Sequence, residues 1–168
     1  MNFVEASKTV AALDENLTTS QTHTPVIDTL GFCYASIDVV FEKVAAAGTN
    51  SAVATVLKLQ QGDGTTYTDI VAFTGSTSTT LPATAGFTIP TPTNTTTDNV
   101  VRFDLDTKGA QGRYLKVQAT GNATGSIYSV ARLSKAEQPP TTAAQKGVLA
   151  AVSGQLGVAL SAGTSYVG

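Results

Sequence analysis

Three consecutive segments between residues 99 and 136 alternate apolar and polar positions with the two-residue period of a β-strand. In VVRFDLD, the apolar Val101, Phe103 and Leu105 share one face, and the charged residues between them share the other. RYLKVQA repeats this alternation, with Leu115 and Val117 predicted to face inward, and GSIYSVARLSK repeats it more loosely. Because each predicted strand has one apolar face, the three strands need a second layer to cover them. The pattern therefore predicts two packed layers of sheet.

The same alternation predicts three more strands upstream. FCYASIDVVFEKV places Cys33 on the apolar face together with alternating aliphatic residues. In VATVLKLQQ, Leu57 and Leu59 point inward, whereas Lys58 and Gln60 point toward water. YTDIVAF follows after a Gly-Asp-Gly segment that suits a hairpin turn. These strands predict an all-β fold, a single antiparallel β-sandwich over residues 31–138.

Three segments lack this alternation. Residues 1–30 are polar and Thr-rich toward their end and are predicted to form an N-terminal arm. Residues 74–98 contain three prolines and many threonines, which predicts a long loop. Residues 139–168 follow a pair of prolines and are predicted to form a C-terminal arm with a thin helical stripe of aliphatic residues.

The apolar residues in these segments have few partners nearby in the sequence. We therefore predict that they contact another protein, although the two in the long loop could also fold back onto the sandwich. The predicted contact residues are Phe3, Val4, Phe87, Ile89, Val148, Leu149, Val152, Leu156 and Leu160.

Composition favours a protein whose surface is covered by other protein. Charged residues make up 13% of the chain, about half of the typical share. Threonine, serine, alanine and glycine take their place. The formal net charge is −2, which argues against nucleic acid as a partner. The longest weakly polar stretch, Gly147 to Leu160, is too short for a membrane span.

No catalytic or metal-binding signature is evident, so we predict neither an enzyme nor a cofactor. His23 and the single cysteine, Cys33, could form a nucleophilic pair in principle, but no third orienting group is visible. Cys33 is predicted to be buried and unreactive. Asp104 and Asp106 share a strand face, which is more typical of a solvated surface than of a calcium site.

Several of these segments resemble known families. LKLQQGDGTTYTDIVAF and GRYLKVQATG resemble jelly-roll and discoidin-like β-sandwich modules. A longer likeness, over residues 31–147, is to the small capsid decoration (cement) proteins of tailed bacteriophages. It includes GFCYASIDVVF, VVRFDLDTKGAQGRYLKVQATG and VARLSKAEQPPTTAAQKG. This resemblance implies a jelly-roll-like sandwich and a structural protein on the outside of the phage head.

The resemblance also implies partners and location. We expect a virion protein, made in the host cytoplasm, that clamps neighbouring major capsid protein subunits and forms a homo-oligomer, with a trimer favoured. The alternative is a carbohydrate- or receptor-binding module on a phage or cell surface. Exposed Tyr67, Tyr114 or Tyr128 around a concave face would favour that alternative, whereas the absence of tryptophan argues against it.

Overall fold

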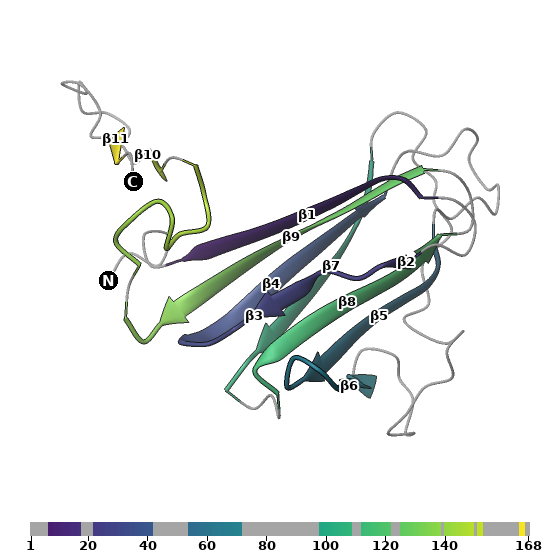
Figure 1. Ribbon diagram of the computed structural model, residues 1–168, viewed down its shortest axis with the longest axis horizontal. Helices are drawn as coiled ribbons and strands as arrows, with labels where there is room; N and C mark the ends of the chain where they lie inside the picture. The colour runs from purple at the N-terminus through teal and green to yellow at the C-terminus, as the bar shows by residue number, and fades with distance from the viewer. Residues whose placement is uncertain are drawn as a thin grey trace.

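Two antiparallel sheets pack face to face in the computed structural model of this chain (Figure 1). The structure describes residues 7–17, 22–41, 54–71, 98–108, 112–121, 125–138, 140–149, 151–152 and 165–166. Residues 74–97 of the predicted loop lie outside these ranges. Among the described residues, no helix is long and apolar enough to cross a membrane.

We call the four-stranded sheet sheet A and the five-stranded sheet sheet B. Sheet A has the strand order β1 (Lys8–Leu17), β9 (Gly125–Ala136), β4 (Phe32–Phe41) and β7 (Asn99–Asp106). Sheet B has the order β2 (Thr22–His23), β8 (Tyr114–Gly121), β5 (Ala54–Gly62) and β6 (Tyr67–Asp69), and β3 (Val26–Asp28) also pairs with β8. A separate small pair joins β10 (Ala151–Val152) to β11 (Ser165–Tyr166).

The strand pairing is that of a jelly roll. β2 and β3 pair with the same strand, and between them the Pro25 carbonyl accepts the Val117 N–H at 3.1 Å. They therefore act as one interrupted edge strand. The strands then pair as β1 with β9, β2–β3 with β8, β4 with β7, and β5 with β6. This is one long hairpin rolled into two sheets, which defines the jelly roll and confirms the predicted fold class.

The core lies between the two sheets and is built from the alternating inward residues. Each large aliphatic or aromatic side chain buried there contributes about 1.5–3 kcal/mol. Phe103 and Leu115, predicted to face inward, are buried, whereas Val101 and Leu105 are only partly covered because β7 is at a sheet edge. The buried cluster consists of Ile27, Ala35, Ile37, Val39, Phe41, Leu57, Leu59, Phe103, Leu115, Val117, Ala119, Ile127, Ala131 and Leu133.

The first thirty residues differ from the sequence prediction, because they contribute β1, β2 and β3 to the two sheets. β1 pairs along β9, where Val10 packs against the core. This segment includes Pro25, and a proline usually interrupts regular structure. A proline is tolerated in an edge strand, however, because its missing N–H can face away from the neighbouring strand. Only residues 1–6 and 18–21 of the predicted arm lie outside the described structure.

Strand β5 is buried on both faces, which the alternation did not predict. Lys58 points away from the core, yet it is as buried as its inward neighbours. Its ammonium lies 3.4 Å from Asp69 Oδ2, and Gln60 donates to the other oxygen of that carboxylate at 2.8 Å. Burial of a charged lysine requires such a partner. Alternation therefore indicated the direction of this side chain but not its exposure.

Candidate partner-binding surface

The predicted contact residues fall partly within the described structure. Leu149 is 97% exposed, and the side chain before it, Val148, is half-buried. Val152 belongs to the short strand β10, so the predicted helical stripe is wrong at this point. The other predicted contacts, Phe3, Val4, Phe87, Ile89, Leu156 and Leu160, lie outside the described residues.

A capped turn precedes Leu149, and we call residues 141–148 the C-terminal turn. At its start the Gln145 N–H donates to Thr142 Oγ1 at 3.2 Å, and Gln145 Oε1 accepts the Thr142 N–H at 3.3 Å. This reciprocal pair is a capping box. At its end Gly147 has a φ of 69°, and the Val148 N–H donates to the Ala143 carbonyl at 3.1 Å. Both ends of a single helical turn are thus satisfied within the segment.

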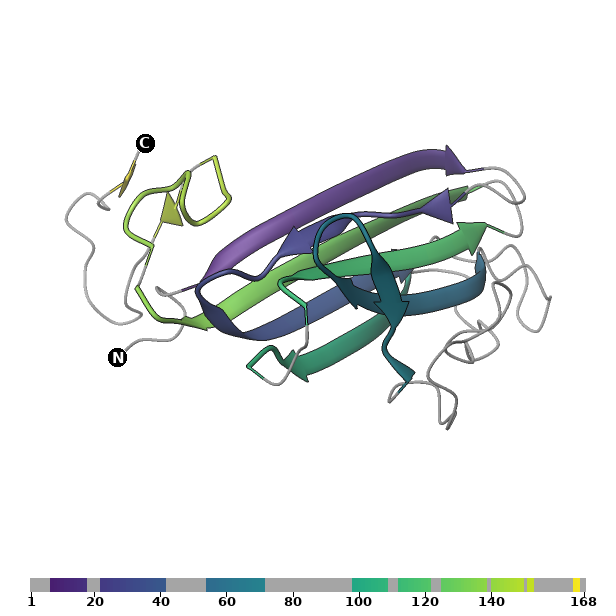
Figure 2. The same ribbon diagram turned by 60° about the horizontal axis from the view of Figure 1, so that its bottom comes forward.

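The C-terminal turn is fixed to the edge of sheet A. The Thr9 N–H of β1 donates to the Lys146 carbonyl at 2.7 Å. Gly147 approaches the Thr9 carbonyl so closely that a Cβ at this position would collide with it. Figure 2 shows this segment beside the start of β1. The base of the predicted C-terminal arm therefore belongs to the sandwich, and Leu149 is exposed directly after it.

A second exposed leucine lies at the tip of the turn between β3 and β4. Gly31 has a φ of 79°, and the Phe32 N–H donates to the Thr29 carbonyl at 3.0 Å, which makes this a glycine-dependent type II turn. Leu30 occupies the exposed corner and is 65% exposed. Figure 1 places this turn and the C-terminal turn at the same end of the sandwich. Two exposed leucines thus lie at one end.

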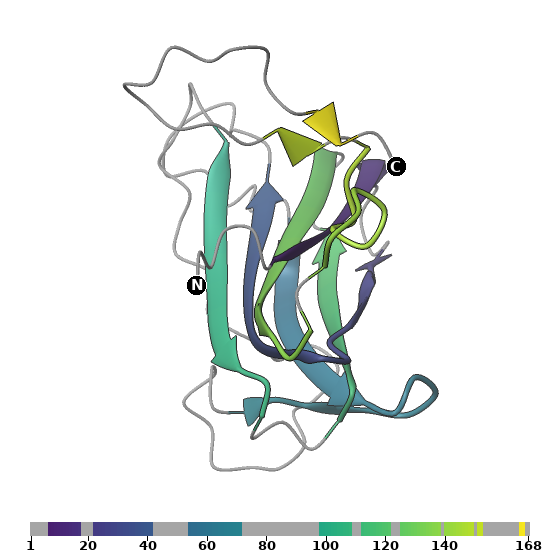
Figure 3. The ribbon, with the colours of Figure 1, turned by 90° about the vertical axis from the view of Figure 1, so that its left-hand side faces the viewer.

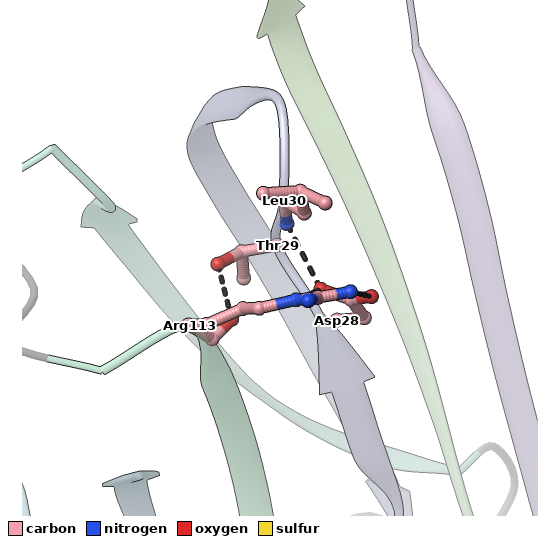
Figure 4. Close-up of polar contacts among 4 residues, drawn as sticks. All are labelled: Asp28, Thr29, Leu30 and Arg113. Carbon is pink, nitrogen blue, oxygen red and sulfur yellow. Dashed lines mark hydrogen bonds and ion pairs between the residues drawn. The ribbon is translucent and has the colours of Figure 1, made fainter. Parts of the chain in front are cut away.

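The turn that carries Leu30 is held by a group of polar contacts (Figure 4). Arg113 donates from Nε and Nη2 to the two carboxylate oxygens of Asp28, at 2.8 and 2.6 Å. Thr29 donates from its N–H and its hydroxyl to the Arg113 carbonyl, at 3.1 and 2.6 Å. The hydrogen bond from Arg113 holds the pKa of Asp28 below its usual value. These bonds fix the main chain beneath Leu30 before any partner binds.

The two residues considered for nucleophilic catalysis have structural surroundings on different sheets. His23, on β2, is fully buried, and its Nε2 lies 3.1 Å from Ser129 Oγ on β9. This contact joins β2, at the edge of sheet B, to β9, an inner strand of sheet A. Cys33 lies near the start of β4 and is only half-buried, so the prediction that it is buried is wrong. Its position at the strand end leaves it less covered than the residues that follow on the same face.

Acidic side chains lie in several separate parts of the fold. Asp104 and Asp106 are exposed on β7. Asp63 closes the hairpin between β5 and β6, because its Oδ1 accepts the N–H groups of Thr66 and Thr65, both at 2.8 Å. These main-chain donors, Thr66 first, lower the pKa of Asp63. Within the described ranges, no three His, Cys, Asp or Glu residues gather as a metal site.

Two of the tyrosines considered for carbohydrate binding, Tyr67 and Tyr114, lie opposite Gly62 on either side of β5. Lys116 Nζ lies 4.4 Å from the centre of the Tyr67 ring, and a Cβ at Gly64 would lie 3.0 Å from the Tyr114 ring. Arg113 also lies over Tyr114, at 5.0 Å. These contacts occupy ring surface that a sugar would need. Tyr128 is half-buried on β9 and thus belongs to the other sheet.

Comparison with family models, curated proteins and solved structures gives no match for this chain. The surface therefore has to be interpreted from its own geometry. Sequence reasoning missed the C-terminal turn, although a signal was present: Thr142 and Gln145 have capping-box spacing, and Gly147 follows at a distance suited to end one helical turn.

Proposed function

We propose that this chain is a structural virion protein that decorates the outside of a phage head and clamps neighbouring major capsid protein subunits. The observation that carries the proposal is the pair of exposed leucines at one end of the sandwich, Leu30 within a hydrogen-bonded turn and Leu149 directly after one. Jelly rolls are common in viral capsid proteins, so the fold is compatible with this role. The sequence resemblance to decoration proteins points in the same direction.

Rigid presentation suits a clamp that must bind without reorganisation. Leu30 is supported by the Asp28–Arg113 pair, and Leu149 follows a turn capped at both ends. Because the main chain is already ordered, a partner gains the burial of these side chains with little loss of main-chain entropy. Each leucine contributes about 1.5–3 kcal/mol if fully covered. Repetition of such a modest contact over a lattice and within an oligomer raises the effective affinity.

The proposal is tested by adding the purified protein to phage heads that lack it, sedimenting the heads, and washing them mildly. We expect wild-type protein to stay with the heads, and Leu30→Asp or Leu149→Asp to be retained less. Thr68→Asp is the matched control, because it adds the same charge at an exposed position on β6. Equal retention of all four proteins would remove this end of the sandwich from the proposal.

A truncation separates the tail from the turn that supports it. Deletion of residues 149–168 leaves the capped turn on β1 in place, so we expect an unchanged melting temperature and reduced retention on heads. Deletion of residues 141–168 also removes the contact with Thr9, and we expect it to lower the melting temperature as well. If the shorter deletion left retention unchanged, the C-terminal tail would have no part in the contact.

A further inference from the structure

Strand β7 is an edge strand of sheet A (Figure 3). The Thr107 N–H donates to the Cys33 carbonyl at 3.0 Å, which fixes the direction of the odd-numbered main-chain groups toward β4. Main-chain directions alternate along a strand, so the even-numbered groups point away from β4. Within the part of the chain that the structure describes, no strand pairs with that side. The residues that present it are Val100, Arg102, Asp104 and Asp106.

The side chains of β7 are exposed on the outer face of the sheet and at least partly buried on its inner face. Val100 is 57% exposed, the Arg102 side chain is 60% exposed, and Asp104 is also exposed, all on the outer face. On the inner face, Val101 and Leu105 are only partly buried against the core. The strand is thus symmetric about Phe103, with an arginine on one side, an aspartate on the other, and an aliphatic residue beyond each.

We infer that a second copy of this chain pairs with β7 in an antiparallel, two-fold contact centred on Phe103. In this register Arg102 lies opposite the partner's Asp104, and Asp104 lies opposite the partner's Arg102. On the inner face Val101 lies opposite the partner's Leu105, which continues the apolar layer across the seam. The even-numbered residues of both copies would form about eight main-chain hydrogen bonds.

Charge selects this register over its neighbours. Moving the two-fold axis by one residue to Arg102 would place two arginines opposite each other. Moving it to Asp104 would place two aspartates opposite each other. Residues directly opposite on antiparallel strands have Cβ atoms about 5 Å apart, where like charges are unfavourable and opposite charges are favourable. Of these three registers, only the one centred on Phe103 gives two opposite-charge pairs and no like-charge pair.

The existing contacts of Arg102 are compatible with this pairing. Its Nε and Nη2 donate to the Asp38 carboxylate at 2.6 and 2.8 Å, across the strand pair β4–β7. A guanidinium has five N–H donors, so others remain for a second carboxylate. The bond to Asp38 also restricts the arginine side chain, which reduces the entropy lost when a second copy binds.

The other sheet edges are less suited to a strand from another molecule. The C-terminal turn occupies β1 at Thr9, and Pro25 interrupts the edge formed by β2 and β3. β6 is only three residues long. Short, interrupted or covered edges resist pairing with other chains. The inference concerns self-association alone, independently of the proposed function, and it specifies a two-fold contact rather than the three-fold one that the family resemblance implies.

Sedimentation velocity over a concentration series tests the contact on the full chain. We expect wild-type protein to shift from monomer to dimer. Asp104→Arg places an arginine opposite the partner's Arg102 and should raise the dimer dissociation constant by roughly tenfold or more. Asp106→Arg is the matched control, because its position lies opposite the partner's Val100, and its dimer should persist. Circular dichroism melting checks that each variant is folded.

A mixing experiment distinguishes charge pairing from a general loss of stability. Asp104→Arg and Arg102→Asp should each be monomeric alone, since each places like charges across the seam. An equimolar mixture should form a heterodimer, because every facing pair then has opposite charge. A wild-type monomer at all concentrations, a trimer, open-ended polymers, or a mixture that stays monomeric would overturn the inference.

Discussion

The two edges of sheet A differ in what contacts their outward main-chain groups. β1 and β7 are the two edge strands of the same sheet, and both have long rows of outward main-chain groups. On β1 the C-terminal turn takes the Thr9 N–H and packs Gly147 against the Thr9 carbonyl. On β7 no described segment does the same, and the edge has a symmetric arrangement of charge instead. The C-terminal turn thus obstructs the β1 edge, whereas the β7 edge is suited to pairing with another strand.

The difference shows how a sandwich controls association without changing its core. An unpaired edge accepts a strand from another molecule unless something covers it. A single helical turn, fixed by one hydrogen bond and one close glycine contact, is sufficient to obstruct β1 near its start. Leu149 is exposed directly after this turn. The C-terminal turn therefore both obstructs the β1 edge and positions the residue that we propose contacts the capsid.

The largest expected effect comes from detaching the C-terminal turn from β1. In Gly147→Ala the new Cβ would collide with the Thr9 carbonyl, and the left-handed φ adds strain. We expect the turn to detach and the free energy of unfolding to fall by about 2 kcal/mol or more. Gly31→Ala is the control, because Gly31 has a similar φ but open space around its Cβ position. Equal losses in urea unfolding of the two variants would show that the contact with Thr9 is unimportant.

A smaller effect is expected from loosening the turn rather than displacing it. Thr142→Ala removes the hydroxyl that accepts the Gln145 N–H, a loss of about 1 kcal/mol for a helix cap. Amide hydrogen exchange at Thr9 should then become roughly fivefold faster, since its acceptor is in the turn. The Ala11 amide points to the same edge without a partner among the described residues, so its exchange should not change. An unchanged exchange rate at Thr9 would contradict the claim that the C-terminal turn protects this edge of β1.

The smallest effect concerns the ion pair that ties β7 to its neighbour. Hydrogen bonding from Arg102 lowers the pKa of Asp38. The folded state therefore gains stability above the unfolded pKa of about 4, and it loses that stability as the pH falls through the lower folded pKa. Asp38→Asn should lower the melting temperature by no more than a few degrees at neutral pH. That gap should close toward pH 2, and a constant gap across the titration would show that the ion pair is not its source.

The inward faces were the most predictable part of the fold. Strict alternation predicted correctly that Phe103, Leu115 and Val117 face the core. Because the side-chain period of a strand is two residues, assigning one position to a face assigns all the others. The alternation was weaker in residues 22–28, where Pro25 and several threonines obscure an edge strand. Exposure was harder to predict than direction. Lys58 points away from the core but is buried, since burial depends on what lies over a face as well as on its periodicity.

The candidate surface was only partly predictable. Leu149 was identified because the residues around it offered no core of their own, and it is exposed. Leu30 was missed, since a single leucine in a turn has no periodicity, and the turn is held in part by Arg113, which is distant in the sequence. The edge position of β7 was also invisible in the sequence, because strand order in a jelly roll is set by long-range pairing. The alternation in VVRFDLD predicted a strand but not its place at the edge.

The central claim is that this chain works as a stoichiometric structural part of a phage head. Quantitative mass spectrometry of purified phage particles tests this proposal most directly. The proposed function predicts a fixed, simple ratio of this chain to the major capsid protein, which stays constant after mild washing. A trace amount that varies between preparations, or complete loss into the wash, would contradict the claim.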